Sequence, residues 1–198
     1  MGEDFKIACI VLAAGMSKRF GGIKQLADFK GKPLVQYALD AANASNAAYV
    51  LFVVGDRSEQ ILASVELGRA LPVFNKDFSK GLATSIASGV SNLPSDSGAA
   101  LFLVADQPLL KSSQLNQLMQ EFEVTGADVV AYSVKGQPRN PILFSRRLFL
   151  ELGSLKGDEG AKRLAERHLA KAQLLRIEDI RAFLDIDTKA EMANLETD

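Results

Sequence analysis

The residues with the clearest chemical potential follow the first apolar run of the chain. Residues 7–12 are apolar and rich in β-branched side chains, and glycines and three cations, Lys18, Arg19 and Lys24, follow them closely. Glycines expose backbone N–H groups and let phosphate oxygens approach, and neighbouring cations add positive charge. The pattern predicts a buried strand that leads into a phosphate-binding loop.

This loop lacks both common nucleotide-binding motifs. Phe20 stands five residues after Gly15, so the P-loop pattern of Gly, four residues, and Gly-Lys-Ser/Thr is absent. Gly-x-Gly-x-x-Gly is absent as well. The sequence therefore argues against a P-loop NTPase, and it disfavours a dehydrogenase that transfers a hydride from a dinucleotide.

Two carboxylates could add a metal ion to such a loop. Asp106 follows the apolar run 99–104, and Asp187 ends the segment 183–187, in which strand alternation would put Asp185 and Asp187 on one side. Mg²⁺ prefers oxygen ligands and usually takes one or two protein carboxylates together with substrate phosphates. Structural roles are the alternatives, because Asp106 could shape a turn and Asp187 could cap a helix.

These residues need a scaffold that gathers the ends of several strands. Apolar runs predict strands at 7–12, 48–54, 71–74, 99–104 and 128–134, and helical spacing predicts helices between them at 34–41, 61–65, 82–90 and 115–122. Such alternation predicts a mostly parallel sheet with helices on both faces, whose ligands bind beyond the carboxyl ends of the strands.

The alternation of predicted strands and helices becomes less regular after residue 134. There the sequence predicts strands at 141–144, 173–177 and 183–186 and helices at 146–152 and 160–169. A last helix is expected from Thr188, because Thr188-x-x-Glu191 has the form of a capping box.

Length and composition favour a small-molecule substrate. A chain of 198 residues fits a single domain, 1–198, and its net charge of −1 gives no electrostatic reason to expect nucleic acid or a membrane surface. The one cysteine, Cys9, is expected in the core, as is Phe78, and His168 is expected near a helix end, where the dipole favours a cation. No signal peptide is apparent, so a cytoplasmic location is expected.

The loop resembles a known signature. Leu12-Ala13-Ala14-Gly15-x-Ser17-x-Arg19-Phe20-Gly21-x-x-Lys24 is similar to the loop of the nucleotidyltransferases that act on molybdenum cofactor, and most similar to that of the cytidylyltransferase branch. Other segments share the resemblance: Gly81-Leu82-x-x-Ser85-Ile86, Asp106-Gln107-Pro108, Arg139-Asn140-Pro141-Ile142-Leu143-Phe144 and Gly157-Asp158-Glu159-Gly160-Ala161.

The resemblance implies a fold, a reaction and a set of site residues. The fold would be a three-layer αβα, Rossmann-like (GT-A-type) mixed sheet, and the reaction Mg²⁺-dependent transfer of CMP from CTP to molybdopterin. Nucleotide would be held by Leu12, Ala13, Ala14, Gly15, Arg19 and Lys24, and the acceptor by Gly81, Ser85, Asn140 and Pro141. Arg19, Lys24 and Asp106 would carry catalysis, and the metal would lie on Asp106 and Asp187.

Two positions bear on the choice of substrates. Guanylyl-transferring relatives carry Gly where this chain has Ala14, and the extra methyl group would narrow the space beside the base. Cytidylyltransferases of this type usually carry His where this chain has Asn140, which puts the acceptor in doubt, since a carboxamide does not titrate near neutrality.

Other functions therefore stay open. They are guanylyl transfer, transfer to a sugar or polyol phosphate, and a non-catalytic accessory role that delivers cofactor to a molybdenum hydroxylase.

Overall fold

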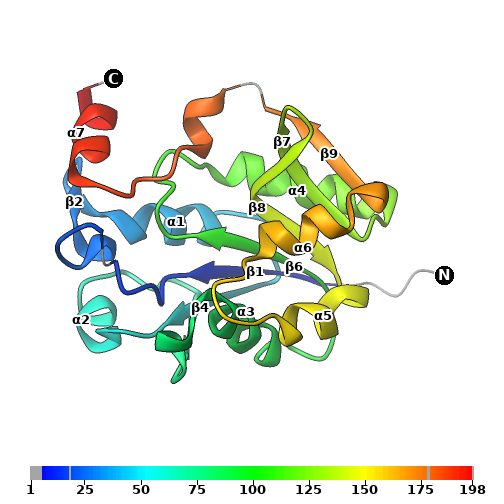
Figure 1. The fold of residues 1–198 in the computed structure, drawn as a ribbon, viewed down its shortest axis with the longest axis horizontal. Helices are drawn as coiled ribbons and strands as arrows, with labels where there is room; N and C mark the ends of the chain where they lie inside the picture. Colours follow the sequence, from blue (N-terminus) through cyan, green and yellow to red (C-terminus); the bar gives the residue numbers. More distant parts are fainter. Residues whose placement is uncertain (1–5, 18, 178, 198) are drawn as a thin grey trace.

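The computed structural model describes residues 6–17, 19–177 and 179–197, so Lys18 lies outside the described residues. A seven-stranded sheet with the order β5-β4-β1-β6-β8-β7-β9 forms its centre (Figure 1). The strands are β1 Lys6–Leu12, β4 Tyr49–Val54, β5 Leu71–Phe74, β6 Ser97–Val104, β7 Val129–Val134, β8 Gln137–Ser145 and β9 Ala172–Arg176. Only β8 runs against its neighbours in this sheet, which confirms the predicted mostly parallel mixed sheet.

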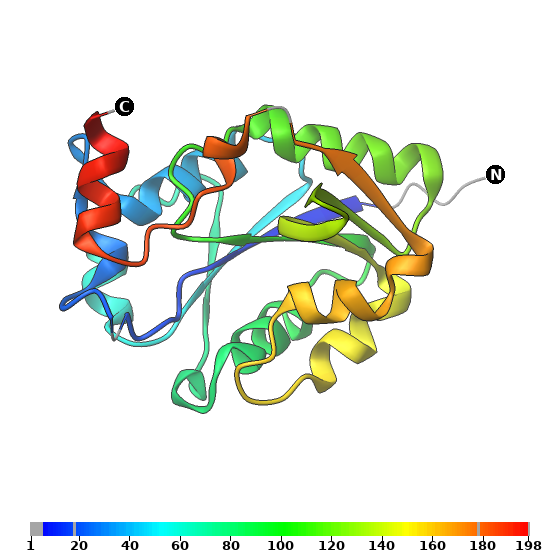
Figure 2. The same ribbon diagram turned by 45° about the horizontal axis from the view of Figure 1, so that its top comes forward.

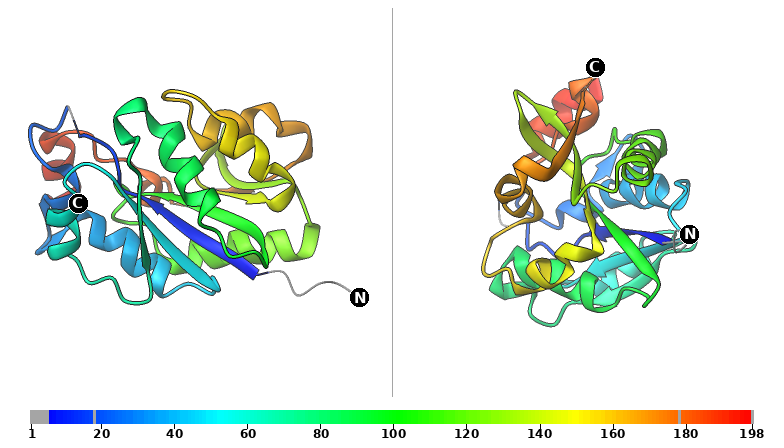
Figure 3. Two further views of the ribbon diagram at one scale, coloured as in Figure 1. Left: turned by 90° about the horizontal axis from the view of Figure 1, so that it is seen from below. Right: turned by 90° about the vertical axis from the view of Figure 1, so that its right-hand side faces the viewer.

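Helices cover both faces of the sheet. One face carries α1 Leu34–Asn43 and α4 Ser112–Thr125, and the other carries α3 Leu82–Ser91, α5 Phe149–Ser154 and α6 Ala161–Arg167 (Figure 2). Seen from below, the last three lie together across their face (Figure 3). The remaining elements are α2 Ser58–Ala63, α7 Lys189–Thr197, the hairpin of β2 Asp28–Phe29 and β3 Lys32–Pro33, and the 3₁₀ turns η1 Lys24–Leu26, η2 Phe78–Lys80, η3 Arg146–Leu148, η4 Leu169–Lys171 and η5 Ile180–Phe183.

Alternation along β1 explains the two cores. Cys9 and Val11 pack toward α1 and α4, whereas Ile10 and Leu12 pack toward α3 and α6. Successive side chains of a strand point to opposite faces, so a strand between two helical layers is apolar throughout. Burial raises the pKa of the Cys9 thiol to about 12, as expected for a small core residue.

The predicted strand at 183–186 is wrong. Phe183 ends η5, and the chain from there to residue 188 has no regular secondary structure. Phe183 and Ile186 are buried while the two residues between them are exposed, a spacing of three that a strand cannot satisfy. Phe183 joins the core beneath α4, and Ile186 joins a separate cluster with Phe20 and Phe29 beside α7.

The region after β7 is also more irregular than predicted. Strand 141–144 is the end of the longer β8, and helix 160–169 ends at Arg167 and continues as η4. Among the described residues, no helix is both long and apolar enough to span a membrane.

Candidate active site

A pocket of about 390 Å³ lies at the carboxyl ends of β1 and β6. These parallel strands are adjacent in the sheet, so the loops that follow them meet at one edge, as predicted. Ten of the residues singled out from the sequence line this pocket: Leu12, Ala13, Ala14, Gly15, Arg19, Lys24, Gly81, Ser85, Asp106 and Asp187.

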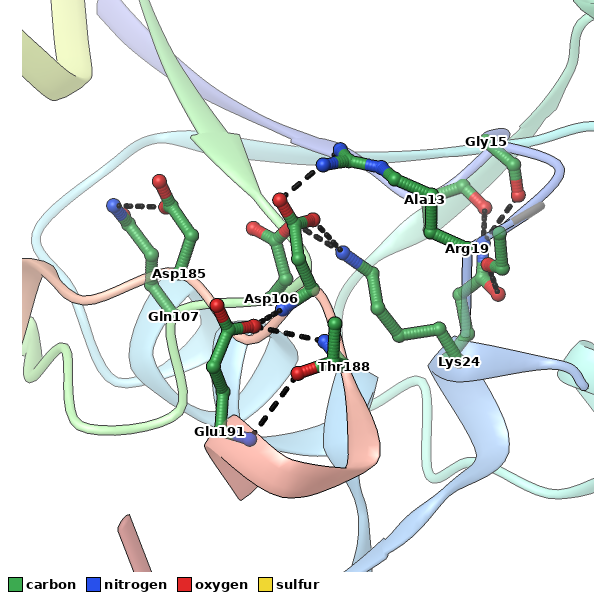
Figure 4. A network of polar contacts seen from close by, with 12 residues as sticks. Ala13, Gly15, Arg19, Lys24, Asp106, Gln107, Asp185, Thr188 and Glu191 are labelled. Carbon is green, nitrogen blue, oxygen red and sulfur yellow. Dashed lines mark hydrogen bonds and ion pairs between the residues drawn. The ribbon is translucent and has the colours of Figure 1, made fainter. Parts of the chain in front are cut away.

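A lysine between two carboxylates forms the polar centre of the pocket (Figure 4). Lys24 Nζ lies 2.7 Å from Asp106 Oδ2 and 3.2 Å from Asp187 Oδ1. Arg19 Nη2 lies 3.0 Å from the other oxygen of Asp187, on a side chain that is 77% exposed. The three segments that carry the proposed phosphate and metal groups thus converge on one point.

Backbone contacts bring the late carboxylate to this point. The N–H of Ile186 donates to the carbonyl of Asp106 at 2.9 Å, which fastens the segment before α7 to the end of β6. The predicted capping box then fixes the next residues, since Glu191 Oε2 accepts from the N–H of Thr188 and of Asp187, each at 2.8 Å. Asp187 is therefore positioned by the backbone hydrogen bond of Ile186 and by a helix cap, without the strand that the sequence predicted.

The two aspartates have the donor set that a hard divalent cation requires. Asp106 Oδ1 is buried and has no hydrogen-bond partner among the described residues, which is costly for a carboxylate oxygen unless a ligand completes it. No group of three or more His, Cys, Asp or Glu side chains suited to a metal occurs in the described parts of the chain. Two carboxylates fit a Mg²⁺ ion that takes its remaining ligands from water and phosphate.

Asp185 has a different environment from Asp187. Its Oδ1 accepts a hydrogen bond from Gln107 Nε2 at 2.9 Å. Burial raises the pKa of Asp185, and the negative charge of Asp106 raises it further. The desolvation is partial, because the residue remains exposed, and its side chain does not line the pocket.

Gln25, which was not predicted from the sequence, lines the pocket beside the glycine loop and supports that loop. Its Nε2 donates to the carbonyls of Ala13 and Gly15 at 3.0 and 2.7 Å, and its Oε1 accepts from Ser17 Oγ at 3.0 Å. The residue is 6% exposed. The sequence offered one signal for this role, since Gln25 directly follows the site residue Lys24 and lies among apolar residues.

The opposite wall is built on a close backbone contact. Gly81 has φ +113°, and a Cβ there would lie 2.2 Å from the carbonyl oxygen of Gly157. The N–H of Ala83 donates to the same carbonyl at 3.0 Å. This contact joins the start of α3 to the loop before α6 and brings Asp158 to the pocket. Phe78 lines the pocket as well, and it also packs against the core, where it was expected.

Two predicted acceptor residues do not line this pocket. Asn140 and Pro141 lie at an irregularity in β8, where consecutive β7 residues Ala131 and Tyr132 pair with Ile142 and Arg139. Proline has no N–H for the ladder, so a bulge accommodates it. The structure thus separates Asn140 and Pro141 from Gly81 and Ser85, with which the sequence analysis grouped them.

Comparison with known proteins identifies the family. The pattern of the MobA-like NTP transferase domain matches residues 9–172. The chain belongs to this family. The matched range contains every predicted site residue except Asp187.

Two relatives match different shares of the chain. This chain is 34% identical over 195 residues to purine catabolism protein PucB of Bacillus subtilis, with 92% of each chain covered. It spans only 32% of the bifunctional protein GlmU of Pelobacter propionicus, to which it is 30% identical over 149 residues.

Solved structures share the fold of this MobA-like domain. Rv0371c of Mycobacterium tuberculosis superposes with a TM-score of 0.86 at 23% identity, covering 98% of this chain and 99% of that one. A second structure of Rv0371c, in complex with manganese, gives 0.79 at 21% identity, covering 97% and 98%. Molybdopterin-guanine dinucleotide biosynthesis protein A of Archaeoglobus fulgidus gives 0.74 at 17% identity, covering 96% and 97%.

Proposed function

We propose that this MobA-like protein transfers CMP from CTP to molybdopterin, or to its metal-loaded form, with release of pyrophosphate and with Mg²⁺ as cofactor. The observation that carries the proposal is the convergence of Lys24, Asp106 and Asp187 on one pocket beside the glycine loop. That set supplies what nucleotidyl transfer needs: a phosphate cradle, a cation and two oxygen ligands.

The reaction requires positioning more than acid–base chemistry. An oxygen of the acceptor phosphate forms a bond to the α-phosphorus of CTP, and the bond from that phosphorus to the bridging oxygen of pyrophosphate breaks. The acceptor is already an anion, so no protein group has to remove a proton from it. The protein's part is to align the two phosphates and neutralise their charge.

The residues of the pocket divide this work. The backbone of Leu12 to Gly15 would hold the base and ribose, and Arg19 and Lys24 would neutralise the triphosphate. Arg19, whose side chain is 77% exposed, has the freedom to leave Asp187 for a phosphate. Mg²⁺, held by Asp106 and Asp187, would supply Lewis-acid neutralisation of the phosphate oxygens.

Ala14 supports cytosine as the base. The residue is 3% exposed, and a Cβ added to Gly55 would lie only 2.9 Å from the Ala14 methyl. The methyl group therefore packs closely against Gly55, and on a residue that lines the pocket it would leave a larger purine less room than a pyrimidine. One carbon gives about 1–3 kcal/mol of discrimination, so we expect Ala14→Gly to narrow the preference for CTP over GTP.

The acceptor would lie against the wall formed by Gly81 and Ser85. Ser85 is buried and accepts from Asn75 Nδ2 at 3.0 Å, which fixes its hydroxyl at the pocket surface. Asn140 and Pro141 would meet the distal part of a long acceptor from β8. The name of the Archaeoglobus protein mentions molybdopterin, and the manganese complex of Rv0371c supports a divalent cation in this fold.

A second candidate function is transfer to another phosphorylated acceptor, or an accessory role toward a molybdenum hydroxylase. Asn140, in place of the usual His, favours it, because the two side chains differ in charge and hydrogen bonding near neutral pH. The name of PucB, a purine catabolism protein, is compatible with an accessory role.

Pyrophosphate release separates these functions. The assay uses Mg²⁺, each of the four nucleoside triphosphates, and molybdopterin present or absent, with Asp106→Asn as the control for contaminating activity. Release with CTP and molybdopterin together supports the proposal. Release with another nucleotide, or without molybdopterin, would contradict this choice of substrates and support transfer to another acceptor. No release under any condition would support the accessory role.

A further inference from the structure

The glycine loop stands between two hollows. Gly15, Met16 and Ser17 line both the main pocket and a second one of about 320 Å³, whose far side includes Asp56 and Arg57. Residues 13–17 lie outside any helix or strand, and the last bond to the neighbouring strand is the one from the Ala13 N–H to the carbonyl of Val53, at 2.8 Å. A loop exposed on two sides needs a support of its own to keep one shape.

We infer that Gln25 is the positioning residue that holds this loop in its nucleotide-binding shape; the inference rests on the proposed function. Its amide directs both N–H groups and its oxygen at the loop, at 2.7–3.0 Å, so three of its four possible hydrogen bonds hold this one segment. Because it is 6% exposed, water cannot easily replace these bonds.

The direction of the bound carbonyls decides what the loop offers to a ligand. A trans peptide is planar, so a carbonyl and the next N–H point in opposite directions. Gln25 holds the carbonyls of Ala13 and Gly15, and therefore the N–H groups of Ala14 and Met16 point away from Gln25. Within the part of the chain that the structure describes, neither N–H donates a hydrogen bond to protein.

These two N–H groups are the donors that Gln25 presents to the nucleotide. Ala14 and Met16 both line the main pocket, as Lys24 does. Backbone N–H groups in such a concave loop bind anionic oxygens, as in other phosphate-binding loops. Gln25 itself lines both pockets, but its hydrogen bonds all go to the loop, through which it acts.

A matched control exists in the same chain. Gln36 on α1 is also buried, at 7% exposed, and its Nε2 donates to Asp40 Oδ1 and to the carbonyl of Glu66. Its Oε1 accepts from the N–H of Glu66 at 2.8 Å. Gln36 thus makes an equivalent set of bonds outside both pockets, and Gln36→Met measures the cost of losing them without touching the glycine loop.

The experiment compares wild type, Gln25→Met, Gln25→Glu and Gln36→Met. Titration calorimetry with Mg²⁺ and CTP should give a Kd about 10- to 100-fold weaker for both Gln25 variants, since Gln25→Glu loses the two donated hydrogen bonds and Gln25→Met loses all three. The Kd of Gln36→Met should be unchanged. In turnover, KM for CTP should rise with kcat within about threefold, because Lys24 and the aspartates stay in place. Hydrogen exchange of ligand-free protein should accelerate in 13–17 and not in β1.

Three outcomes would overturn the inference. One is equal Kd and equal exchange of the loop in Gln25→Met and wild type. Another is a rise in Kd of the same size in Gln36→Met. The third is unfolding of both Gln25 variants while Gln36→Met stays folded, which would assign Gln25 to core stability. If wild type binds none of the four triphosphates but loop exchange still accelerates in the Gln25 variants, the proposed function fails and the bracing role alone survives.

Discussion

Replacement of Lys24 by methionine tests whether this lysine takes the place of a metal ion in the ligand-free protein. Its Nζ contacts Asp106 at 2.7 Å and Asp187 at 3.2 Å, and Arg19 adds a second cation on the outer side of Asp187. Methionine keeps most of the side-chain volume and removes the charge. The two carboxylates then face each other without the ammonium ion between them.

The expected loss of stability follows from the exposure of the three side chains. Lys24 is 15% exposed, Asp106 21% and Asp187 35%, so the cluster is neither dry nor fully solvated. Exposed ion pairs contribute about 0–1 kcal/mol, and breaking a buried pair costs about 3–5 kcal/mol. We expect Lys24→Met to lower the free energy of unfolding by about 1–3 kcal/mol without metal.

Metal binding should change in the opposite direction. The ammonium ion repels a divalent cation and occupies the carboxylate oxygens that the cation needs, so its removal should tighten binding of Mn²⁺ alone by at least about 10-fold, which is about 1.4 kcal/mol. At Mn²⁺ concentrations 10 times the Kd, linkage should return about 1.4 kcal/mol of stability to the variant. Turnover should nevertheless fall by at least about 100-fold, because the triphosphate loses its cation.

The assay combines electron paramagnetic resonance titration of free Mn²⁺ with urea unfolding at several Mn²⁺ concentrations. Lys32→Met is the control, since Lys32 pairs with Asp40 at 2.8 Å on side chains that are 52% and 45% exposed. It should leave both the stability and the Mn²⁺ affinity close to those of wild type, because exposed ion pairs contribute little. Equal or weaker Mn²⁺ binding in Lys24→Met than in wild type would refute the reasoning.

Three further predictions follow from the geometry. Gly15→Ala should keep the melting temperature, because a Cβ there meets no protein atom within 4 Å, but it should weaken CTP binding in calorimetry, because the methyl group would enter the pocket. Gly81→Ala should lower the free energy of unfolding in urea by more than about 2 kcal/mol, because its Cβ would lie 2.2 Å from a carbonyl oxygen. The Arg147 guanidinium holds the pKa of Asp128 below its usual range, so Asp128→Asn should cost about 1 kcal/mol at pH 7 and progressively less as pH falls below about 4 through the folded-state pKa; an equal cost at pH 7 and pH 2 would contradict this. Burial raises the pKa of Cys9 to about 12, so a thiol reagent should label it only after unfolding, and rapid labelling of native protein would contradict that burial.

The strand ends of the site could be predicted because they depend on local patterns. Continuous apolar runs indicate β1 and β6, and parallel neighbours bring Gly15 and Asp106 to one edge of the sheet. The arrival of Asp187 was predicted for a wrong reason. The residues before Asp187 alternate between apolar and polar, as in a strand. The structure places Asp187 through the backbone hydrogen bond from Ile186 to Asp106 and through the helix cap. A hydrogen bond between distant segments produces no periodic pattern in the sequence.

Gln25 and the acceptor side were beyond local patterns for other reasons. A glutamine is ordinarily a surface residue, so its burial beside the loop depends on three partners that the folded chain supplies. The close contact of Gly81 with Gly157 joins segments far apart in sequence. The motif containing Asp158 was visible, but its place on the pocket wall follows only from that contact.

The turn η1 links the two requirements of nucleotide binding. It is a single 3₁₀ turn, whose consecutive side chains point about 120° apart, so Lys24 reaches the carboxylates while Gln25 reaches the loop and Leu26 packs on the core. A shift of this turn would move the cation and the loop donors together. Under the proposed function, base and phosphate recognition would depend on this turn together with the glycine loop and the two aspartates, whereas acceptor binding would depend on α3, the loop before α6 and the bulge of β8. Because these two sets lie on different segments of the chain, we expect a substitution on the acceptor side to leave nucleotide binding intact.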